Sequence, residues 1–244
     1  MTSKQDQEAT LVSHLDALRR ALIRSLVALA IGFVPMFLAS PYVLDFFCRQ
    51  IALQGAMALH YFSPMEVFLL QVKISALLDC VLFSPYIAWN AWQFVLPALY
   101  EKEKRFIRSI AALTSLLFIA GVAFCLVVCF PLVVQFGMSF AGDSLMPVFG
   151  ISNIVSLALW LSLAFGCMFQ FPLVTYALIR AGIVSYETVC DKRPYVVVAI
   201  LLVAALLTPP DVVSQVILGV PTYLLFEAGL LAARRYRGRT RKED

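Results

Sequence analysis

The sequence has few charged residues and no long polar stretch. Only 14% of its 244 residues are Asp, Glu, Lys or Arg, whereas a typical soluble domain has about 25%. In contrast, 61% are hydrophobic and the mean hydropathy is +0.87. Such a chain has too little polar material to cover a water-exposed surface. Because apolar runs extend from Ala21 to Ala233, we expect one membrane domain and no separate aqueous domain.

The sequence also lacks the residue clusters that enzymes and metal sites need. His14 and His60 are the only histidines, which excludes an H-E-x-x-H zinc motif, and there is neither a G-x-S-x-G motif nor a glycine-rich phosphate loop. No apolar segment holds two acids. The six cysteines lack the spacing of a zinc site or a disulfide framework, so we expect free thiols. We therefore expect binding or transport, with no enzymatic activity, cofactor, metal or nucleic-acid partner.

Six apolar segments are candidate membrane spans, at residues 22–40, 74–96, 108–134, 151–179, 195–208 and 212–232. At 1.5 Å per residue, the first four are each long enough to cross about 30 Å of hydrocarbon. The fifth offers only about 14 apolar residues between Arg193 and Pro209, and the sixth reaches only about 14 residues before Glu227. We predict an all-α integral membrane protein with six transmembrane helices, the last two short, and a basic tail at 233–244. Length alone leaves a re-entrant final hairpin open.

Lysine and arginine gather in alternate connections between these segments. They precede the first span, separate spans two and three, separate spans four and five, and follow the last span; these places hold 17 of the 19 basic residues. Only Arg49 and Lys73 fall in the other connections. Because basic residues are retained on the cytoplasmic side of a membrane, we expect both termini in the cytoplasm. This orientation fits six full spans, and it equally fits four spans with a re-entrant pair.

The first motif lies on an amphipathic helix that we expect to open at residues 13–20, before the first span. It resembles the amino-terminal His-Leu-x-Glu-Leu-Arg motif of the TatC family at His14, Leu15, Leu18 and Arg19. Ala17 stands where that family has its acidic residue, and Asp16 lies one position earlier, rotated by about 100° on a helix. Asp16 either replaces the missing carboxylate or forms a variant capping box with Ser13, and the sequence leaves both open.

The second motif covers residues 90–105, from Asn90-Ala91-Trp92-Gln93-Phe94 through Pro97-Ala98-Leu99-Tyr100 to Glu103-Lys104-Arg105. It closely resembles the TatC signature W-x-F-x-x-P-A-L-Y-x-x-E-[KR]-[KR]. The resemblance implies that Glu103 contacts a twin-arginine signal peptide, and we expect Asp16, Arg19 and Phe94 to contribute to the same site. The chemistry is suitable because a carboxylate can pair a guanidinium bidentately, a geometry that lysine does not match.

Weaker matches give the remaining candidate residues. Residues 64–75 resemble another TatC motif and contain Glu66 and Lys73. In the fourth span Gln170 stands where the family frequently has Glu; an amide keeps the hydrogen bonding without a titratable proton, which excludes a proton relay at this residue. A polar cavity that thins the bilayer remains an open interpretation there, and the short last spans favour thinning through hydrophobic mismatch.

The last turn, Thr208-Pro209-Pro210-Asp211, is flanked by hydrogen-bonding side chains at Thr208 and Gln215. These side chains either tie spans five and six together or, as the resemblance implies, receive the single-span partners TatA and TatB; both interpretations stay open. Asp211 is a further polar residue of this turn. Asp79, in the second span, has no counterpart in the family motifs, and we assign it no role.

Together the motifs identify the chain as a member of the TatC family. The resemblance implies a receptor for twin-arginine signal peptides and a core subunit of a translocase that exports folded proteins, driven by the proton-motive force. It further implies partners similar to TatA and TatB, self-association in a larger complex, contact with lipid, and a multi-pass position in a bacterial cytoplasmic (inner) membrane. The alternative is a small-solute secondary transporter, for which the sequence shows no inverted repeat.

Overall fold

The computed structural model describes residues 4–53, 59–95, 104–139, 149–207 and 212–240. Over these residues the regular structure is helical apart from one parallel strand pair of two residues each, β1 (Leu59–His60) with β2 (Phe149–Gly150). The helices are α1 (Lys4–Leu53), α2 (Pro64–Val95), α4 (Lys104–Phe124), the π-helix η1 (Cys125–Cys129), α5 (Phe130–Ser139), α6 (Ile151–Met168), α7 (Phe171–Arg180), α8 (Tyr186–Asp191), α9 (Arg193–Leu207) and α10 (Val212–Thr240). The predicted all-α membrane fold is confirmed.

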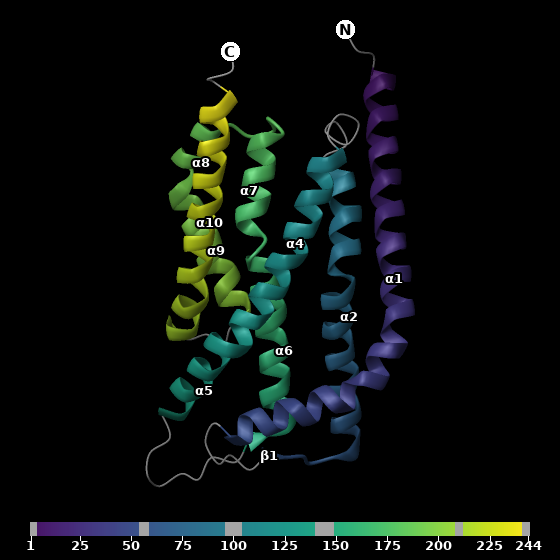
Figure 1. Cartoon of the computed structure of the whole chain (residues 1–244), viewed down its shortest axis with the longest axis vertical. Helices are drawn as coiled ribbons and strands as arrows, with labels where there is room; N and C mark the ends of the chain where they lie inside the picture. Colours follow the sequence, from purple (N-terminus) through teal and green to yellow (C-terminus); the bar gives the residue numbers. More distant parts are fainter. Residues whose placement is uncertain (1–3, 54–58, 96–103, 140–148, 208–211, 241–244) are drawn as a thin grey trace.

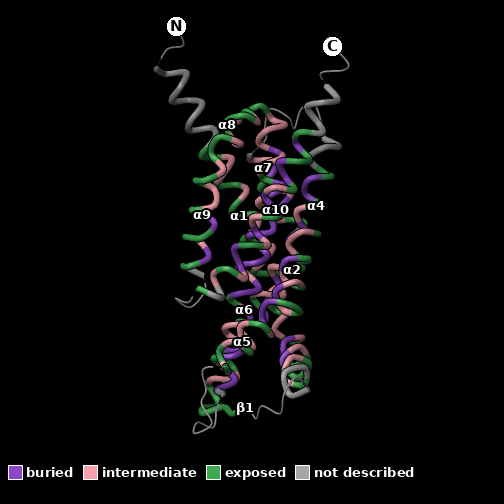
Figure 2. The backbone as a smooth tube through the Cα atoms, turned by 90° about the vertical axis from the view of Figure 1, so that its left-hand side faces the viewer, coloured by how far each residue is buried: buried purple, intermediate pink, exposed green. Residues whose placement is uncertain are grey.

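The helices form an elongated bundle with both ends of the chain at the same end (Figure 1). α1 packs mainly on α2, α2 contacts α4 and α6, and α10 lies against α7 and α9. The largest core cluster joins η1, α6, α9 and α10 through Cys125, Phe165, Met168, Ala204 and Leu218. Buried residues run through the middle of the bundle, and many exposed residues of its outer surface are large and apolar, as contact with lipid requires (Figure 2).

The helix that contains the first apolar segment, residues 22–40, does not end at Pro41. α1 continues through Pro35 and Pro41 to Leu53, and bends in its lower part (Figure 1). A proline inside a helix removes the hydrogen bond to the carbonyl four residues earlier, which for Pro41 belongs to Phe37. The Ser40 hydroxyl donates to that Phe37 carbonyl at 2.8 Å. The serine therefore satisfies the group that the proline leaves free, and the helix continues.

α2 contains the same arrangement. Pro85 leaves the carbonyl of Val81 without its helical donor, and the Ser84 hydroxyl donates to this carbonyl at 2.8 Å. Hydroxyl donors of this kind are how membrane helices tolerate proline, because no water is present to bond the freed carbonyl. A serine directly before a mid-span proline is thus a sign of a continued helix.

Within the described ranges, five helical segments are long and apolar enough to cross a membrane, and α9 contains a shorter apolar segment, Arg193–Ala205. The fifth apolar segment therefore forms a short helix, as predicted. The sixth apolar segment belongs to the 29-residue α10, in which Gln215–Arg234 is long enough to span. The helix continues past Glu227, whose carboxylate pairs with Arg193 of α9 at 3.0 Å. The lower ends of α9 and α10 lie above the level that α2 and α6 reach (Figure 1).

Candidate functional site

The end of the bundle that holds both termini carries three of the four predicted signal-binding residues. Asp16 and Arg19 are exposed on α1, and Phe94 is half-buried in the last turn of α2, the helix on which α1 packs. Glu103 lies outside the described residues. The structure therefore places Asp16, Arg19 and Phe94 on neighbouring helices at one end.

Asp16 is not part of a helix cap. α1 begins at Lys4, so Ser13 and Asp16 lie within its first third, where backbone N–H groups are already bonded inside the helix. The capping-box interpretation is wrong because the helix starts about three turns earlier than the apolar pattern indicates. The Asp16 carboxylate instead pairs with Arg20, one turn further on, at 3.3 Å, and both side chains are at least half exposed. Ala17, one position on, is half-buried, so the two positions present different faces of α1.

Gln170 lies at the break between α6 and α7, where it links two spans. Its side-chain amide donates to the backbone carbonyls of Gly166 in α6 and Thr114 in α4, both at 3.1 Å. The backbone N–H of Gln170 bonds Cys167 instead of Gly166, because the helix tightens before Pro172. The amide thus replaces the missing donor to Gly166 and adds a contact between spans.

Thr114 joins this polar group to a third span. Its hydroxyl accepts a hydrogen bond at 2.7 Å from the indole nitrogen of Trp92, which is 6% exposed in α2. The side chain of Thr114 thus bonds to α2, and its backbone carbonyl bonds to Gln170. The sequence analysis places Trp92 in a signature motif but gives no sign of this bond, because Trp92 and Thr114 meet only through packing.

Glu66 joins α2 to α6 at the end of the bundle opposite the termini. Its two carboxylate oxygens accept hydrogen bonds from the backbone N–H groups of Phe62, at 2.9 Å, and Ser152, at 3.2 Å. Ser152 lies in the first turn of α6, where unpaired N–H groups favour a negative charge. Ser63, directly before α2, accepts a hydrogen bond from the Met65 N–H at 3.3 Å. Glu66 therefore fixes the start of α2 against the start of α6.

Lys73, nearer the middle of α2, is exposed and donates from its ammonium to the Ser156 hydroxyl of α6 at 2.9 Å. Asp79 is one and a half turns deeper in α2 and is buried against α1 at Gly32, where a Cβ atom would collide with the Asp79 carboxylate. Among the described residues, one Asp79 oxygen has no hydrogen-bond partner.

The last hairpin is tied by polar contacts at two levels. The Gln215 amide of α10 donates to the Leu201 carbonyl of α9 at 2.9 Å. Nearer the end that holds the termini, Glu227 accepts from both Arg193 and the Tyr223 hydroxyl, each at 3.0 Å. Gln215 therefore bonds across spans five and six in the way that the sequence suggests. Thr208 and Asp211 lie outside the described residues.

Comparisons with known proteins agree with this architecture over almost the whole chain. The family model of the Sec-independent protein translocase protein (TatC) matches residues 13–221. The TatC protein of Carboxydothermus hydrogenoformans is 34% identical over 231 residues, which cover 94% of this chain and 95% of the relative. The TatC protein of Haemophilus influenzae is 35% identical over 240 residues, covering 96% and 93%.

The backbone comparison gives the same result. A crystal structure of the twin-arginine translocase receptor TatC superposes with a TM-score of 0.81 at 31% sequence identity, covering 90% of this chain and 99% of that one. The range matched by the family model, residues 13–221, includes both motifs, at residues 13–20 and 90–105. The chain is a multi-pass membrane protein that belongs to the TatC family.

Proposed function

We propose that this chain is the receptor for twin-arginine signal peptides in a translocase that exports folded proteins. The observation that carries the proposal is its similarity, in sequence and in backbone, to the translocase receptor TatC over nearly its whole length. The chain binds signal peptides and takes part in transport, and the proton-motive force energises this transport, as the family resemblance implies. Gln170 contributes packing and hydrogen bonds but no proton transfer, since a carboxamide does not titrate.

The signal peptide binds at the end of the bundle that holds Asp16, Arg19 and Phe94, with Glu103 as the second carboxylate. An exposed i,i+4 ion pair such as Asp16–Arg20 contributes only about 0.3–0.5 kcal/mol. A charge-assisted hydrogen bond from an arginine of the signal contributes about 1.5–3 kcal/mol. The incoming guanidinium can therefore displace Arg20 from Asp16, and each of the two acids can take one arginine of the pair.

Charge and shape support the orientation of the protein. We place both termini in the cytoplasm of a bacterium, with six segments crossing its inner membrane, because 17 of the 19 basic residues fall in alternate connections. Partners similar to TatA and TatB bind at the last hairpin, around Thr208 and Gln215, and several copies of the chain associate in a larger complex. Asp211, Glu66 and Lys73 then belong to the outer half of the protein.

Crosslinking tests the signal site. A photoreactive signal peptide with an Arg-Arg pair should crosslink to the native chain in membranes, and Glu103→Ala should abolish the crosslink. Asp16→Ala should weaken it several-fold. Glu101→Ala is the matched control, because it removes an acid from the same connection without touching the signature position. Unchanged crosslinking in Glu103→Ala, or equal crosslinking of a Lys-Lys signal to the native chain, would contradict the proposed site.

Thiol labelling tests whether the last hairpin crosses the membrane. Val212, the first residue of α10, is exposed, so a single cysteine at this position in a cysteine-free chain can report its location. An impermeant maleimide added from the outer face should label Val212→Cys in intact cells. A cysteine at Arg234 should label only after the membrane is opened, and failure of Val212→Cys to label would show a re-entrant hairpin.

A variant of Gln215 separates the two interpretations of this residue. Gln215→Leu removes the hydrogen bond to Leu201 and should lower the stability of the hairpin by about 0.6 kcal/mol, the usual value for a bond between membrane helices. If Gln215 also receives a partner, its crosslink to a TatB-like protein should fall as well. A normal crosslink in a less stable hairpin would leave Gln215 with a structural role alone.

A further inference from the structure

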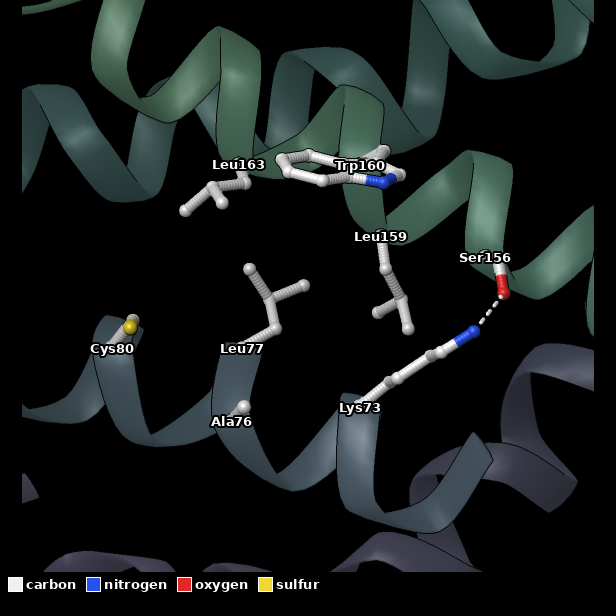
Figure 3. Close-up of a pocket in the computed structure, with 8 residues that line it drawn as sticks. All are labelled: Lys73, Ala76, Leu77, Cys80, Ser156, Leu159, Trp160 and Leu163. Atoms are coloured by element: carbon white, nitrogen blue, oxygen red, sulfur yellow. Dashed lines mark hydrogen bonds between the residues drawn. The ribbon is translucent and has the colours of Figure 1, made fainter. Parts of the chain in front are cut away.

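An apolar groove with one amine at its end runs along the outside of α2 and α6. Its volume is about 300 Å³, which is at the lower end of the range for sites that hold small molecules. Leu77 of α2 faces Leu159 and Leu163 of α6 across it, and Trp160, 62% exposed, closes one side (Figure 3). Lys73 and Ser156 are its polar side chains. The groove therefore opens toward the lipid rather than into the bundle.

The polarity of the groove changes along the helix axes. Lys73 and Ser156 lie at one end, and Leu163 lies at the other, seven residues after Ser156 (Figure 3). At 1.5 Å per residue the apolar end is about 10 Å deeper in the bilayer than the polar end. Both α2 and α6 start at the end of the bundle opposite the termini (Figure 1), so the amine faces the membrane surface on that side. A phospholipid has the same order, with phosphate at the surface and acyl chains below it.

The Lys73 ammonium has donors left for a ligand. It is exposed, and the bond to Ser156 uses one of its three N–H groups. Within the described part of the chain no carboxylate lies within ion-pair distance of Lys73; the ion pairs found there are Asp16–Arg20, Asp45–Arg49 and Arg193–Glu227. Glu66, the acid at the start of the same helix, already accepts two backbone N–H bonds. A phosphate oxygen can accept the hydrogen bonds that the Lys73 ammonium still has to donate, and it supplies the negative charge that is missing beside it.

We propose that the groove binds one anionic phospholipid from the leaflet opposite the termini. The headgroup phosphate accepts hydrogen bonds from Lys73 and Ser156, and one acyl chain lies between Leu77 and Leu163 beside Trp160. A net negative headgroup is favoured over a zwitterionic one because no acid of the site is free to balance a headgroup ammonium. An apolar helix of a partner would cover the groove but leave the ammonium without an anion, which is unfavourable at the edge of the hydrocarbon.

Fluorescence quenching by brominated lipid tests the proposal on the full chain in vesicles. The signal of Trp160 is the difference between the native chain and Trp160→Phe, since the other two tryptophans remain in both. Phosphatidylglycerol with brominated chains should quench Trp160 at about one-fifth of the mole fraction that brominated phosphatidylcholine needs, the factor expected for one basic residue near an anionic headgroup. Equal quenching by the two lipids would refute the site.

Variants identify the residues responsible. Lys73→Met should remove the preference for phosphatidylglycerol, and Lys73→Arg should keep it. Arg49→Met is the matched control, because Arg49 is the other basic residue on that side and already pairs with Asp45 at 2.8 Å. Loss of the preference in Arg49→Met, or its survival in Lys73→Met, would overturn the assignment.

Three further tests, one variant and two kinds of added competitor, distinguish a bound acyl chain from other occupants of the groove. Ala76→Phe narrows the groove from its exposed rim and should reduce the quenching while Lys73 remains; unchanged quenching would show surface attraction without a bound chain. Inorganic phosphate or glycerol phosphate at millimolar concentration should leave the quenching unchanged, and displacement by either would show a phosphate site without a lipid. Displacement of both lipids alike by a synthetic apolar single-span peptide would show that the groove holds a helix.

Discussion

Replacing Gln170 by methionine should lower the free energy of unfolding by about 0.6–2.6 kcal/mol. Leaving the Gly166 carbonyl without a donor costs about 1–3 kcal/mol. Losing the bond to Thr114 between spans costs about 0.6 kcal/mol. The substitution also removes the Gln170 side-chain oxygen, which is buried without a partner among the described residues, and this returns about 1 kcal/mol. Methionine has a similar volume, so no cavity adds to the loss.

Reversible unfolding in mixed micelles, with the fraction of a denaturing detergent as the variable, measures this difference. Gln135→Met is the matched control, because it makes the same chemical change at an exposed position of α5 and should alter the free energy of unfolding by less than about 0.5 kcal/mol. A Gln170→Met protein as stable as the native chain, or more stable, would show that the amide does not support the break between α6 and α7.

Two other changes test the packing between spans. Thr114→Val leaves the buried indole N–H of Trp92 without an acceptor and should lower the free energy of unfolding by about 1–3 kcal/mol, whereas Thr114→Ser, which keeps the hydroxyl, should lose less. Gly229→Ala should cost about 1–3 kcal/mol, because its Cβ would lie 2.5 Å from the backbone of Pro172 and force α10 away from α7. Gly137→Ala, where a Cβ meets nothing within 4 Å, should be neutral or stabilising, and equal losses in the two glycine variants would contradict this account of the contact.

The spans could be predicted from the sequence because lipid imposes one requirement, a long apolar helix, and an apolar run shows it directly. The helix that contains the first predicted span continues past Pro41, where the apolar run of residues 22–40 ends. Proline reduces helix stability in water, but inside a membrane the Ser40 hydroxyl supplies a donor for the freed carbonyl, and the helix continues to Leu53. The Ser-Pro dipeptide is a local signal that could have indicated this outcome.

The candidate site could be predicted only in part. The motifs assigned Asp16, Arg19 and Phe94 to one site, and the structure places all three near one end of the bundle. The capping box at Asp16 was wrong because the helix begins at Lys4. A polar segment before a span gives no sign of where a helix starts. The pairing of Asp16 with Arg20 does follow from i,i+4 spacing and could have been expected.

Contacts between distant segments could not be predicted. The pattern Ser63-x-x-Glu66 before an apolar run is typical of a helix start, yet nothing local indicates that Glu66 also holds the N–H of Ser152, 86 residues away. In the same way, Lys73 was recognised as a motif residue, but the groove beside it is formed by α2 and α6 together. Such sites require the three-dimensional structure because each helix supplies only one wall.

The short α9 influences which molecules gather beside the protein in the plane of the membrane. With 15 residues it is about 22 Å long, whereas the hydrocarbon is about 30 Å thick, so in the proposed six-span arrangement the bilayer next to α9 would deform by several ångströms. Each ångström of mismatch costs a fraction of a kcal/mol. A neighbour whose own apolar segment is short relieves this deformation when it sits against α9. In that arrangement the mismatch would favour short single-span neighbours on the α9 side of the perimeter before any specific contact forms.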